Sequence, residues 1–209
     1  TSHPKDMTTD LIEVYKNSKK LMPLVHLPVQ SGSDKILELM NRKHTIKKYL
    51  DIFNKLKRIN PNIQFSSDFI IAYPGENEND FKDTLKLIEE IKFINSFSFI
   101  FSPRPGTVAA DLPTIDKKVS LKRLEIVQDR LFNNQRKMNK SLENTTLNVL
   151  VENRMDDKTK LFGRSEHMTS VLFNGSDDLI GKIVKVKILN SNRNNLFGEA
   201  IDQSNQKVA

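Results

Sequence analysis

The stretch His26-Leu-Pro-Val-Gln-Ser-Gly-Ser33 runs from a short apolar segment into a polar turn that contains a glycine, and the helical pattern DKILELM follows directly. A strand, a turn and a helix in this order form one β/α unit. Two more apolar strand patterns follow downstream, each ending in a polar or glycine-proline turn. This repetition predicts an α/β domain whose helices cover a parallel sheet.

The hydrophobic periods give the expected elements of this domain. Strands are expected at 24–28, 63–73 and 96–101, and helices at 34–40, 45–59 and 78–91. Thr45 and Asn77 are well placed as N-caps of the second and third helices. Because three β/α units can neither close a barrel nor protect both sheet edges, we expect further strands upstream of Thr1, in a longer chain of which this is a fragment.

Composition restricts the chemistry that these residues can perform. The chain has 209 residues, of which 37% are hydrophobic, and no apolar run approaches the roughly 18 residues of a membrane span. We therefore expect one or two globular domains, a cytoplasmic location and no membrane partner. Since the chain has no cysteine and only four histidines, which are dispersed, no metal ligand is predicted. No P-loop, G-x-G-x-x-G or Ser/His/Asp pattern is present, and no catalytic side chain is assigned.

The positive charge is concentrated in one segment. The net charge is +7, and residues 117–143 hold eight Lys and Arg against three Asp and Glu, a difference of +5. The segment has a helical period through Leu121, Leu124, Val127 and Leu131. A basic linker helix of this kind suits a polyanion such as RNA. The alternative is a solvated, lysine-rich helix face that binds nothing.

The pattern changes near residue 144, where the segments become short and lose their helical period. About five strands with Gly and Asn turns predict a small antiparallel barrel of the OB type. We therefore divide the chain into 1–143 and 144–209. In "KIVKVKIL", Lys185 and Lys187 alternate with aliphatic residues, so a basic strip is expected on the outside. Such lysines suit RNA, although lysines also protect sheet edges from aggregation.

The turns after the three expected strands carry the candidate ligand residues, because β/α barrels bind ligands at the carboxyl ends of their strands. In the first turn, Gln30 offers an amide for ribose hydroxyls, Gly32 permits close backbone approach, and Ser33 is a helix cap. A plain strand-turn-helix connection would explain Gly32 and Ser33 equally well. It leaves the Pro-Val-Gln sequence before them unexplained.

The other two turns contain charged residues. Asp68 lies within an apolar strand, and a buried acid needs a partner, so it is a better site candidate than Glu76, which the dipole of the following helix stabilises. Arg104 stands between two prolines, and the rigid backbone directs its guanidinium toward a carboxylate, a phosphate or a base. A solvent-exposed arginine in an ordinary turn is the alternative.

The segments "HLPVQSGSDKILELMNRKHT", "DFIIAYPGENENDF" and "FSPRPGTVAADL", in this order and spacing, resemble the second half of the radical S-adenosylmethionine methylthiotransferases. "TSHPKDM" is similar to the segment that precedes them, and "LFGRSEHM…FNGSDDLIGKIVKVKIL…NLFGEAI" resembles the family's RNA-binding TRAM domain. The resemblance covers nearly the whole chain. It implies the second half of a partial (β/α) radical SAM barrel, followed by a small all-β TRAM barrel.

The resemblance is closest to the branch that methylthiolates C2 of N6-isopentenyladenosine beside the tRNA anticodon. The branch acting on threonylcarbamoyladenosine is one alternative, and a non-catalytic RNA-binding module is another. The family chemistry implies S-adenosylmethionine, two [4Fe-4S] clusters, an electron donor protein and the tRNA anticodon stem-loop as cofactors and partners. In this chemistry a 5′-deoxyadenosyl radical abstracts the hydrogen from C2.

The resemblance also implies roles for single residues by motif position. Gln30, Ser31 and Gly32 match the ribose-side turn, Arg42 is the expected partner of the methionine carboxylate, and Asp68 to Tyr73 flank the adenine. Arg104 is expected near the nucleoside, and Arg164, Lys185 and Lys187 are expected to contact RNA. The chain departs from the family in lacking the cluster cysteines, so we expect these residues alone to be inactive. Ala72 stands where the family commonly has glycine.

Overall fold

The computed structural model describes residues 2–18, 20–156 and 158–201. It divides into two compact units, Thr1–Asn134 and Gln135–Ala209, so the division falls about nine residues before the one expected from the sequence. Within the described residues, no helix is both long and apolar enough to cross a membrane.

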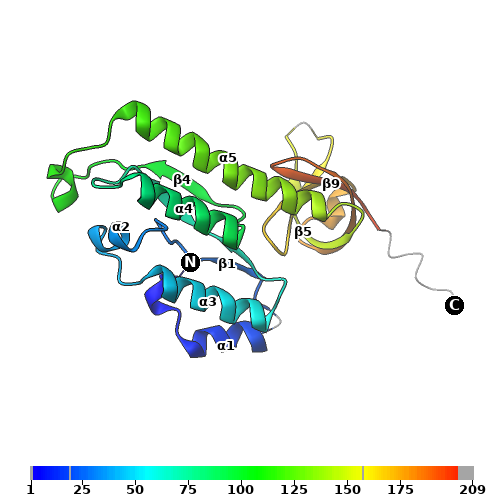
Figure 1. The fold of residues 1–209 in the computed structure, drawn as a ribbon. Helices are drawn as coiled ribbons and strands as arrows, with labels where there is room; N and C mark the ends of the chain where they lie inside the picture. The colour runs from blue at the N-terminus through cyan, green and yellow to red at the C-terminus, as the bar shows by residue number, and fades with distance from the viewer. Residues whose placement is uncertain (1, 19, 157, 202–209) are drawn as a thin grey trace. The chain divides into compact units, whose positions relative to one another are not determined.

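The first unit contains three β/α repeats behind an N-terminal helix. Its elements are η1 (Pro4–Asp6), α1 (Thr9–Asn17), β1 (Leu24–His26), α2 (Asp34–Leu39), α3 (Ile46–Ile59), β2 (Gln64–Ser66), β3 (Asp68–Ile71), α4 (Glu78–Ile91), β4 (Phe97–Ile100), η2 (Val108–Asp111) and most of α5 (Lys117–Ser141) (Figure 1). The three predicted strands and the three predicted helices begin within one residue of their expected positions. The α/β prediction is therefore confirmed.

The strands pair in parallel, as β/α repeats require. β1 pairs with β2, β3 pairs with β4, and a parallel bridge joins Gln30 to Phe69. The strand expected over 63–73 is interrupted at Ser67. There the Ser67 N–H donates to Ser96 Oγ at 2.9 Å, and Ser67 Oγ accepts from the Val29 N–H at 2.9 Å. Side-chain hydrogen bonds thus replace the ladder at the Ser67 N–H, whereas the Ser67 carbonyl still accepts from the Phe97 N–H at 3.0 Å.

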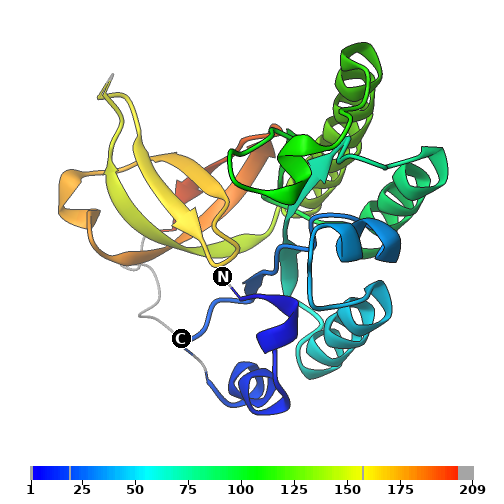
Figure 2. The same ribbon diagram turned by 90° about the vertical axis from the view of Figure 1, so that its left-hand side faces the viewer.

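Helices cover one face of the strands. Figure 2 shows α2, α3 and α4 on the same side of them, and the strand residues Val25, Phe65, Phe69 and Ile71 are at most 2% exposed in the core. The alternate positions form what we call the open face, which carries His26, Asp68, Ile70, Phe97 and Phe99. Phe97 and Phe99 remain 60% and 55% exposed there. The parallel sheet is thus apolar on its helix side and partly polar on the other.

Caps define where the helices begin. Thr45 Oγ1 accepts from the Lys48 N–H at the start of α3, and Asn77 forms a reciprocal capping box with Asp80 at the start of α4. Ser33 likewise caps α2 through the Ile36 N–H. All three caps were predicted from the sequence, because Ser, Thr and Asn side chains satisfy the first free N–H groups of a helix.

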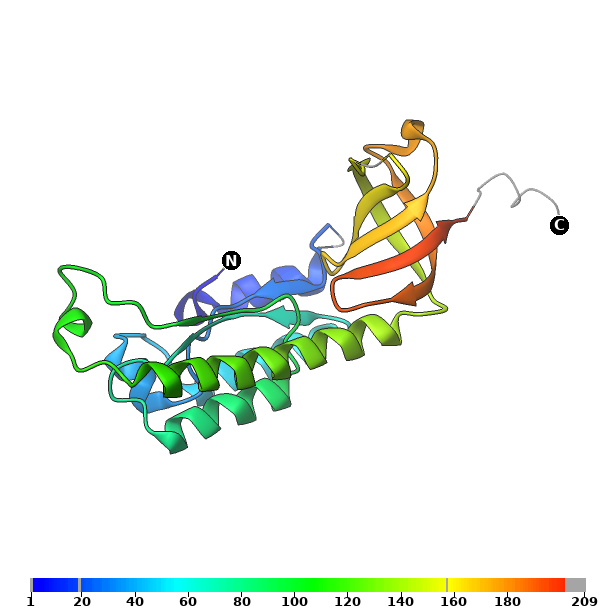
Figure 3. The same cartoon turned by 90° about the horizontal axis from the view of Figure 1, so that it is seen from above.

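Helix α5 lies beside α4 (Figure 3), where the Asn134 side-chain amide donates to the Ile88 carbonyl at 3.2 Å. Val127 and Leu131 enter the core of the first unit, as predicted. The expectation that Leu121 belongs to the same apolar stripe is wrong, because this residue is 50% exposed. Arg123 turns inward instead and is only 8% exposed, so this arginine does not belong to a solvent-facing basic surface.

The second unit is a five-stranded closed barrel. Its strands are β5 (Thr146–Arg154), β6 (Leu161–Ser165), β7 (Ser170–Asn174), β8 (Ile183–Ser191) and β9 (Asn195–Ala200), with η3 (Asp177–Leu179) before β8. They are ordered β5-β6-β7-β9-β8, which is the connectivity of an OB barrel, as predicted. The expectation of wholly antiparallel pairing is wrong for one pair, since β7 and β9 are parallel. The interior is aliphatic apart from one aromatic ring and contains Val149, Val151, Leu161, Val171, Phe173, Val186, Ile188 and Leu196.

Candidate active site at the strand ends

Three loops follow the parallel strands of the first unit. β1 leads into residues 27–33, β3 into 72–77 and β4 into 101–107. Carboxyl ends of parallel strands share one edge of a sheet, and α/β proteins bind ligands at that edge. Most of the cofactor residues expected from the sequence lie in or next to the first two loops.

Gln30 has an unusual backbone conformation. Its φ is 75°, a left-handed value that is rare for residues other than glycine and costs free energy. Backbone hydrogen bonds impose it: the Gln30 N–H donates to the Asp68 carbonyl at 3.0 Å, and the Gln30 carbonyl accepts from the Ile70 N–H at 2.9 Å. The neighbouring strand therefore fixes the position of this half-buried residue. Strained residues held in this way are often found at functional sites.

Ser31 and Gly32 pack against helix α4. The Gly32 N–H donates to Thr84 Oγ1 at 2.9 Å, and the fully buried Ser31 hydroxyl lies 3.4 Å from the same oxygen. A Cβ on Gly32 would lie 2.5 Å from the carbonyl oxygen of Asp83, which is closer than atoms approach without displacement. Close helix packing therefore accounts for the glycine. A cofactor contact by these two residues stays a prediction.

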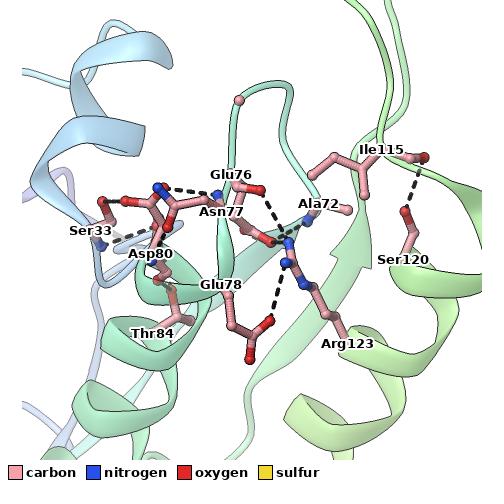
Figure 4. A network of polar contacts seen from close by, with 12 residues as sticks. Ser33, Ala72, Glu76, Asn77, Glu78, Asp80, Thr84, Ile115, Ser120 and Arg123 are labelled. Atoms are coloured by element: carbon pink, nitrogen blue, oxygen red, sulfur yellow. Dashed lines mark hydrogen bonds and ion pairs between the residues drawn. The ribbon is translucent and has the colours of Figure 1, made fainter.

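The second loop is held by a buried ion pair (Figure 4). Glu76 Oε1 lies 2.8 Å from Arg123 Nη1 and also accepts from the Ala72 N–H at 3.2 Å. The two side chains are 1% and 10% exposed. Burial raises the pKa of Glu76, and the nearby Arg123 opposes that rise. Sequence reasoning assigned Glu76 only to the dipole of the following helix and placed Arg123 in the basic segment 117–143, so this pair was not predicted.

Asp80 connects the first loop to the second (Figure 4). Its carboxylate accepts from Ser33 Oγ at 2.7 Å, Lys35 Nζ at 2.9 Å and the Asn77 N–H at 2.9 Å. Burial disfavours the charged form, but these donors outweigh it, and the pKa of Asp80 is lowered. The loops after β1 and β3 are thus tied together by one ionised carboxylate.

The open face carries a chain of polar side chains. His26 Nδ1 lies 2.7 Å from Ser66 Oγ, and His26 Nε2 lies 3.5 Å from Asp68 Oδ2. The Asp68 side chain is 31% exposed, so the expected buried acid is only partly buried, but it does have the partner that such an acid needs. The fold brings Ser, His and Asp together although no sequence motif marks them. Since the Ser66 residue is 3% exposed, we assign it no nucleophilic role.

Arg42 and Tyr73 differ in how many of their polar groups form hydrogen bonds within the protein. Tyr73 donates through its hydroxyl to the Leu39 carbonyl at 3.0 Å and packs its ring edge-on against Phe101, and burial raises its pKa. Arg42 Nη2 donates to the Pro28 carbonyl at 3.1 Å, but Arg42 Nε is buried without a hydrogen-bond partner among the described residues. Burial lowers the pKa of this guanidinium. Arg42 therefore has an unused donor.

Arg104 lies in the exposed loop after β4. Its carbonyl accepts from the N–H and the hydroxyl of Thr107, which closes the turn expected from the two prolines. Gln30 and Asp68 are neighbours through a backbone hydrogen bond. Arg104 instead follows the far end of β4, whose first residue, Phe97, is the partner of Asp68. The structure thus joins two of the three predicted charged or amide groups and leaves Arg104 at the loop tip.

The residues expected to bind RNA lie on the outer surface of the barrel. Lys185 and Lys187 are exposed on β8 and alternate with the buried Val186 and Ile188, as predicted, although Ile183 at the start of the strand is 67% exposed. Arg164 on β6 covers the Phe162 ring at 5.3 Å and pairs with Glu152 at 3.1 Å. Lys187 faces Glu199 across the β8–β9 ladder. This basic strip is therefore interleaved with acids.

Comparisons with known proteins match both units. A family model described as the Radical SAM superfamily matches residues 1–88, and a model of the TRAM domain matches residues 140–201. Residues 1–88 thus match the radical SAM superfamily, and residues 140–201 match a TRAM domain. A solved coproporphyrinogen III oxidase from Escherichia coli, described as a radical SAM enzyme, matches 95% of this chain and 50% of its own with a TM-score of 0.53 and 12% identity. That likeness supports the fold alone.

Curated relatives confirm the resemblance to the methylthiotransferases. The tRNA-2-methylthio-N(6)-dimethylallyladenosine synthase of Pelagibacter ubique is 68% identical over all 209 residues, which are 47% of that protein. The protein of the same name from Ruthia magnifica is 47% identical over 202 residues, covering 96% of this chain and 46% of the relative. The chain therefore spans about half the length of the curated relatives it matches.

Proposed function

We propose that this chain is the part of a tRNA methylthiotransferase that supplies the second half of the cofactor barrel and an RNA-binding domain. The reaction would place a methylthio group on C2 of N6-isopentenyladenosine next to the anticodon. The observation that carries the proposal is 68% identity over every residue of this chain to a synthase named for this product. The two family matches occur in the order that such an enzyme requires.

S-adenosylmethionine is the proposed cofactor, and its reductive cleavage supplies the radical when it is bound. Gln30 and Asp68 are suited to its hydroxyl and amino groups, because both are only partly buried and both are fixed by the backbone bond between them. Arg42 is assigned to its carboxylate, because Arg42 Nε has no hydrogen-bond partner in the part of the chain that the structure describes. Ser31, Gly32 and Tyr73 would shape the loops around it, since their polar groups already have protein partners.

Two [4Fe-4S] clusters belong to the proposal, but this chain does not fit them. It has no cysteine, and the described residues contain no group of three His, Cys, Asp or Glu side chains that could hold a metal ion. Cluster ligands and the site for an electron donor protein would therefore lie outside these residues. Reconstitution of the 209 residues with iron and sulfide should give no iron–sulfur absorbance and no cleavage of S-adenosylmethionine.

The enzymatic part of the proposal is tested with the full-length protein that contains this sequence. Anaerobic incubation with S-adenosylmethionine and two tRNAs, one carrying isopentenyladenosine and one carrying threonylcarbamoyladenosine, is followed by mass spectrometry of the nucleosides. We expect a methylthio product only from the isopentenyl tRNA. Product only from the other tRNA would move the chain to the second branch, and no product with either would favour a binding module.

The RNA-binding part is tested on the barrel surface. Charge reversal at Arg164, Lys185 and Lys187 should weaken binding to an anticodon stem-loop and reduce the salt dependence of binding by roughly 0.7–0.9 in log–log slope per lost phosphate contact. Lys182→Glu is the matched control, because it reverses the same charge at an exposed lysine of the barrel that is not among the proposed RNA contacts. If all four variants bound the stem-loop with equal affinity, Arg164, Lys185 and Lys187 would be solvated surface charges that do not contact RNA.

A further inference from the structure

The outer surface of the barrel carries a row of apolar side chains across three of its strands. The backbone register places Phe162 on β6 opposite Leu172 on β7, and Leu172 opposite Phe197 on β9. The residues that precede these three in their strands are fully buried in the barrel interior. Because side chains alternate along a strand, the three side chains point outward. We call them the aromatic row.

The row crosses the face with which barrels of this type bind nucleic acids. In an OB barrel that face consists of the second and third strands, together with the loops after the first and fourth strands. Here the second and third strands are β6 and β7, which carry Phe162 and Leu172. The loop between β8 and β9 is held from within, since the buried Asn139 amide donates to the carbonyls of Asn192 and Arg193 at 2.8 and 3.0 Å.

Each ring of the row carries a cation. The Arg164 guanidinium carbon lies 5.3 Å from the centroid of the Phe162 ring, and Lys160 Nζ lies 5.3 Å from the centroid of the Phe197 ring. Within the described part of the chain, two of the three cation–π contacts thus occur in this one row. A planar guanidinium above a ring offers a further flat surface on which a base can stack.

This combination of groups suits unpaired nucleotides. The two rings are separated by two strand spacings, about 10 Å, so each can receive a different base while Leu172 fills the space between them. Stacking on aromatic rings accepts any base, and the neighbouring cations lie where the phosphates of a bound strand would pass. A duplex does not fit the row in this way, because its bases are already paired and stacked on one another.

We propose that the aromatic row, with Arg164 and Lys160 beside it, is a stacking platform for unpaired RNA bases. RNA as the ligand rests on the proposed function, whereas the platform adds where bases are held and by what kind of contact. It is separate from the lysine strip of Lys185 and Lys187, because β8 pairs with neither β6 nor β7. The lysine strip would contact phosphates, and the aromatic row would contact bases.

A tryptophan placed in the row tests for stacking directly. The chain has no tryptophan, so Phe197→Trp introduces a single fluorescent indole. It is titrated with an unpaired RNA oligonucleotide, with the same oligonucleotide annealed to its complement, and with an oligonucleotide of equal length in which abasic sites replace the bases. We expect quenching by the unpaired RNA and little by the other two. Equal quenching by the duplex or by the abasic strand would overturn the platform, as would emission that changes with protein concentration alone, which would assign the row to a second copy of the chain.

Two further variants measure what the rings contribute to binding. Phe162→Leu and Phe197→Leu keep an apolar outer side chain, so the barrel should remain folded by circular dichroism. Each should weaken binding of the unpaired RNA about tenfold through the loss of one stacked base. The salt dependence should not change, because no phosphate contact is lost. Ile183→Ala is the matched control, since Ile183 is an apolar residue on β8, 67% exposed and outside the row, and it should bind RNA as the original chain does.

Failure of the platform can be distinguished from failure of the proposed RNA binding. If both ring variants bind RNA as the original chain does while charge reversal at Lys185 and Lys187 weakens binding, the platform is overturned and RNA binding by the barrel stands. If the ring variants weaken binding and the charge reversals do not, the platform stands and the lysine strip is not a phosphate contact.

Discussion

The two units contain the same kind of ion pair in opposite environments. Arg123 and Glu76 in the first unit lie 2.8 Å apart with side chains 10% and 1% exposed, whereas Arg164 and Glu152 in the barrel lie 3.1 Å apart with side chains 36% and 37% exposed. The barrel interior is closed and apolar, and its charges are outside. The first unit instead uses buried polar groups to hold the loops at its strand ends. Position rather than distance should therefore decide what each pair contributes.

The largest effect is expected when the buried pair is broken. Glu76→Ala removes the buried carboxylate and leaves the Arg123 guanidinium only the exposed Glu78 carboxylate, 3.4 Å away, so it should reduce the free energy of unfolding by about 3–5 kcal/mol. All three tyrosines lie in the first unit and the chain has no tryptophan, so tyrosine fluorescence during urea denaturation reports on this unit alone.

Glu152→Ala provides the matched comparison in the barrel. It should cost no more than about 1 kcal/mol, measured by circular dichroism, because its pair is solvated. A double replacement, Glu76→Leu with Arg123→Met, should recover much of the loss, since apolar residues of similar volume can replace a buried pair. If Glu76→Ala proved as mild as Glu152→Ala, the loop after β3 would be held by other contacts.

The fold of both units could be predicted from the sequence because it depends on local signals. Period-2 and period-3.6 patterns, together with the caps Ser33, Thr45 and Asn77, specify elements that tertiary contacts do not override. The interruption at Ser67 could not be predicted, because it depends on hydrogen bonds to Val29 and Ser96, which are distant in sequence. The parallel pair β7–β9 was missed for the same reason, since strand order in a barrel is a long-range property.

The candidate site was predicted less completely. Turn motifs located the loops, but the side chains that hold them come from elsewhere. Arg123 stands in a basic helix, and a helical period based on Leu121 assigns it to the surface. His44 lies within a segment that resembles the family but was given no role there, and it is distinguished by its burial and by ring nitrogens that have no hydrogen-bond partner among the described residues. Sequence patterns identify residues by type and spacing, whereas these two residues are distinguished by their environment.

A second, smaller effect concerns pH and should be confined to the first unit. An unfolded histidine titrates near pH 6.5, whereas burial, followed by Arg42, lowers the folded pKa of His44 to about 4. The unfolded chain therefore binds this proton first, and stability is lost as the pH falls from about 6.5 to about 4, by at most ~3 kcal/mol.

Comparison of two proteins at two pH values measures this contribution. Tyrosine-monitored unfolding of the original chain and of His44→Phe at pH 7 and pH 5 should show a smaller loss of stability in the variant, because its side chain does not titrate. An identical loss in both proteins would mean that His44 is protonated as easily when folded as when unfolded. The His44 ring would then not be buried without hydrogen-bond partners in solution.

The smallest expected change in stability tests why residue 32 is a glycine: close packing against α4, or room for a ligand. A Cβ there would lie 2.5 Å from the Asp83 carbonyl oxygen, just as a Cβ on Gly163 in the barrel would lie 2.5 Å from the Leu150 carbonyl oxygen. Both Gly→Ala variants should lose about 1–3 kcal/mol through overpacking. Gly106→Ala meets no atom within 4 Å and should lose only about 1 kcal/mol through its positive φ. If Gly32→Ala were as mild as Gly106→Ala, α4 would not require the glycine, and its small size would serve the approach of a ligand to the loop instead.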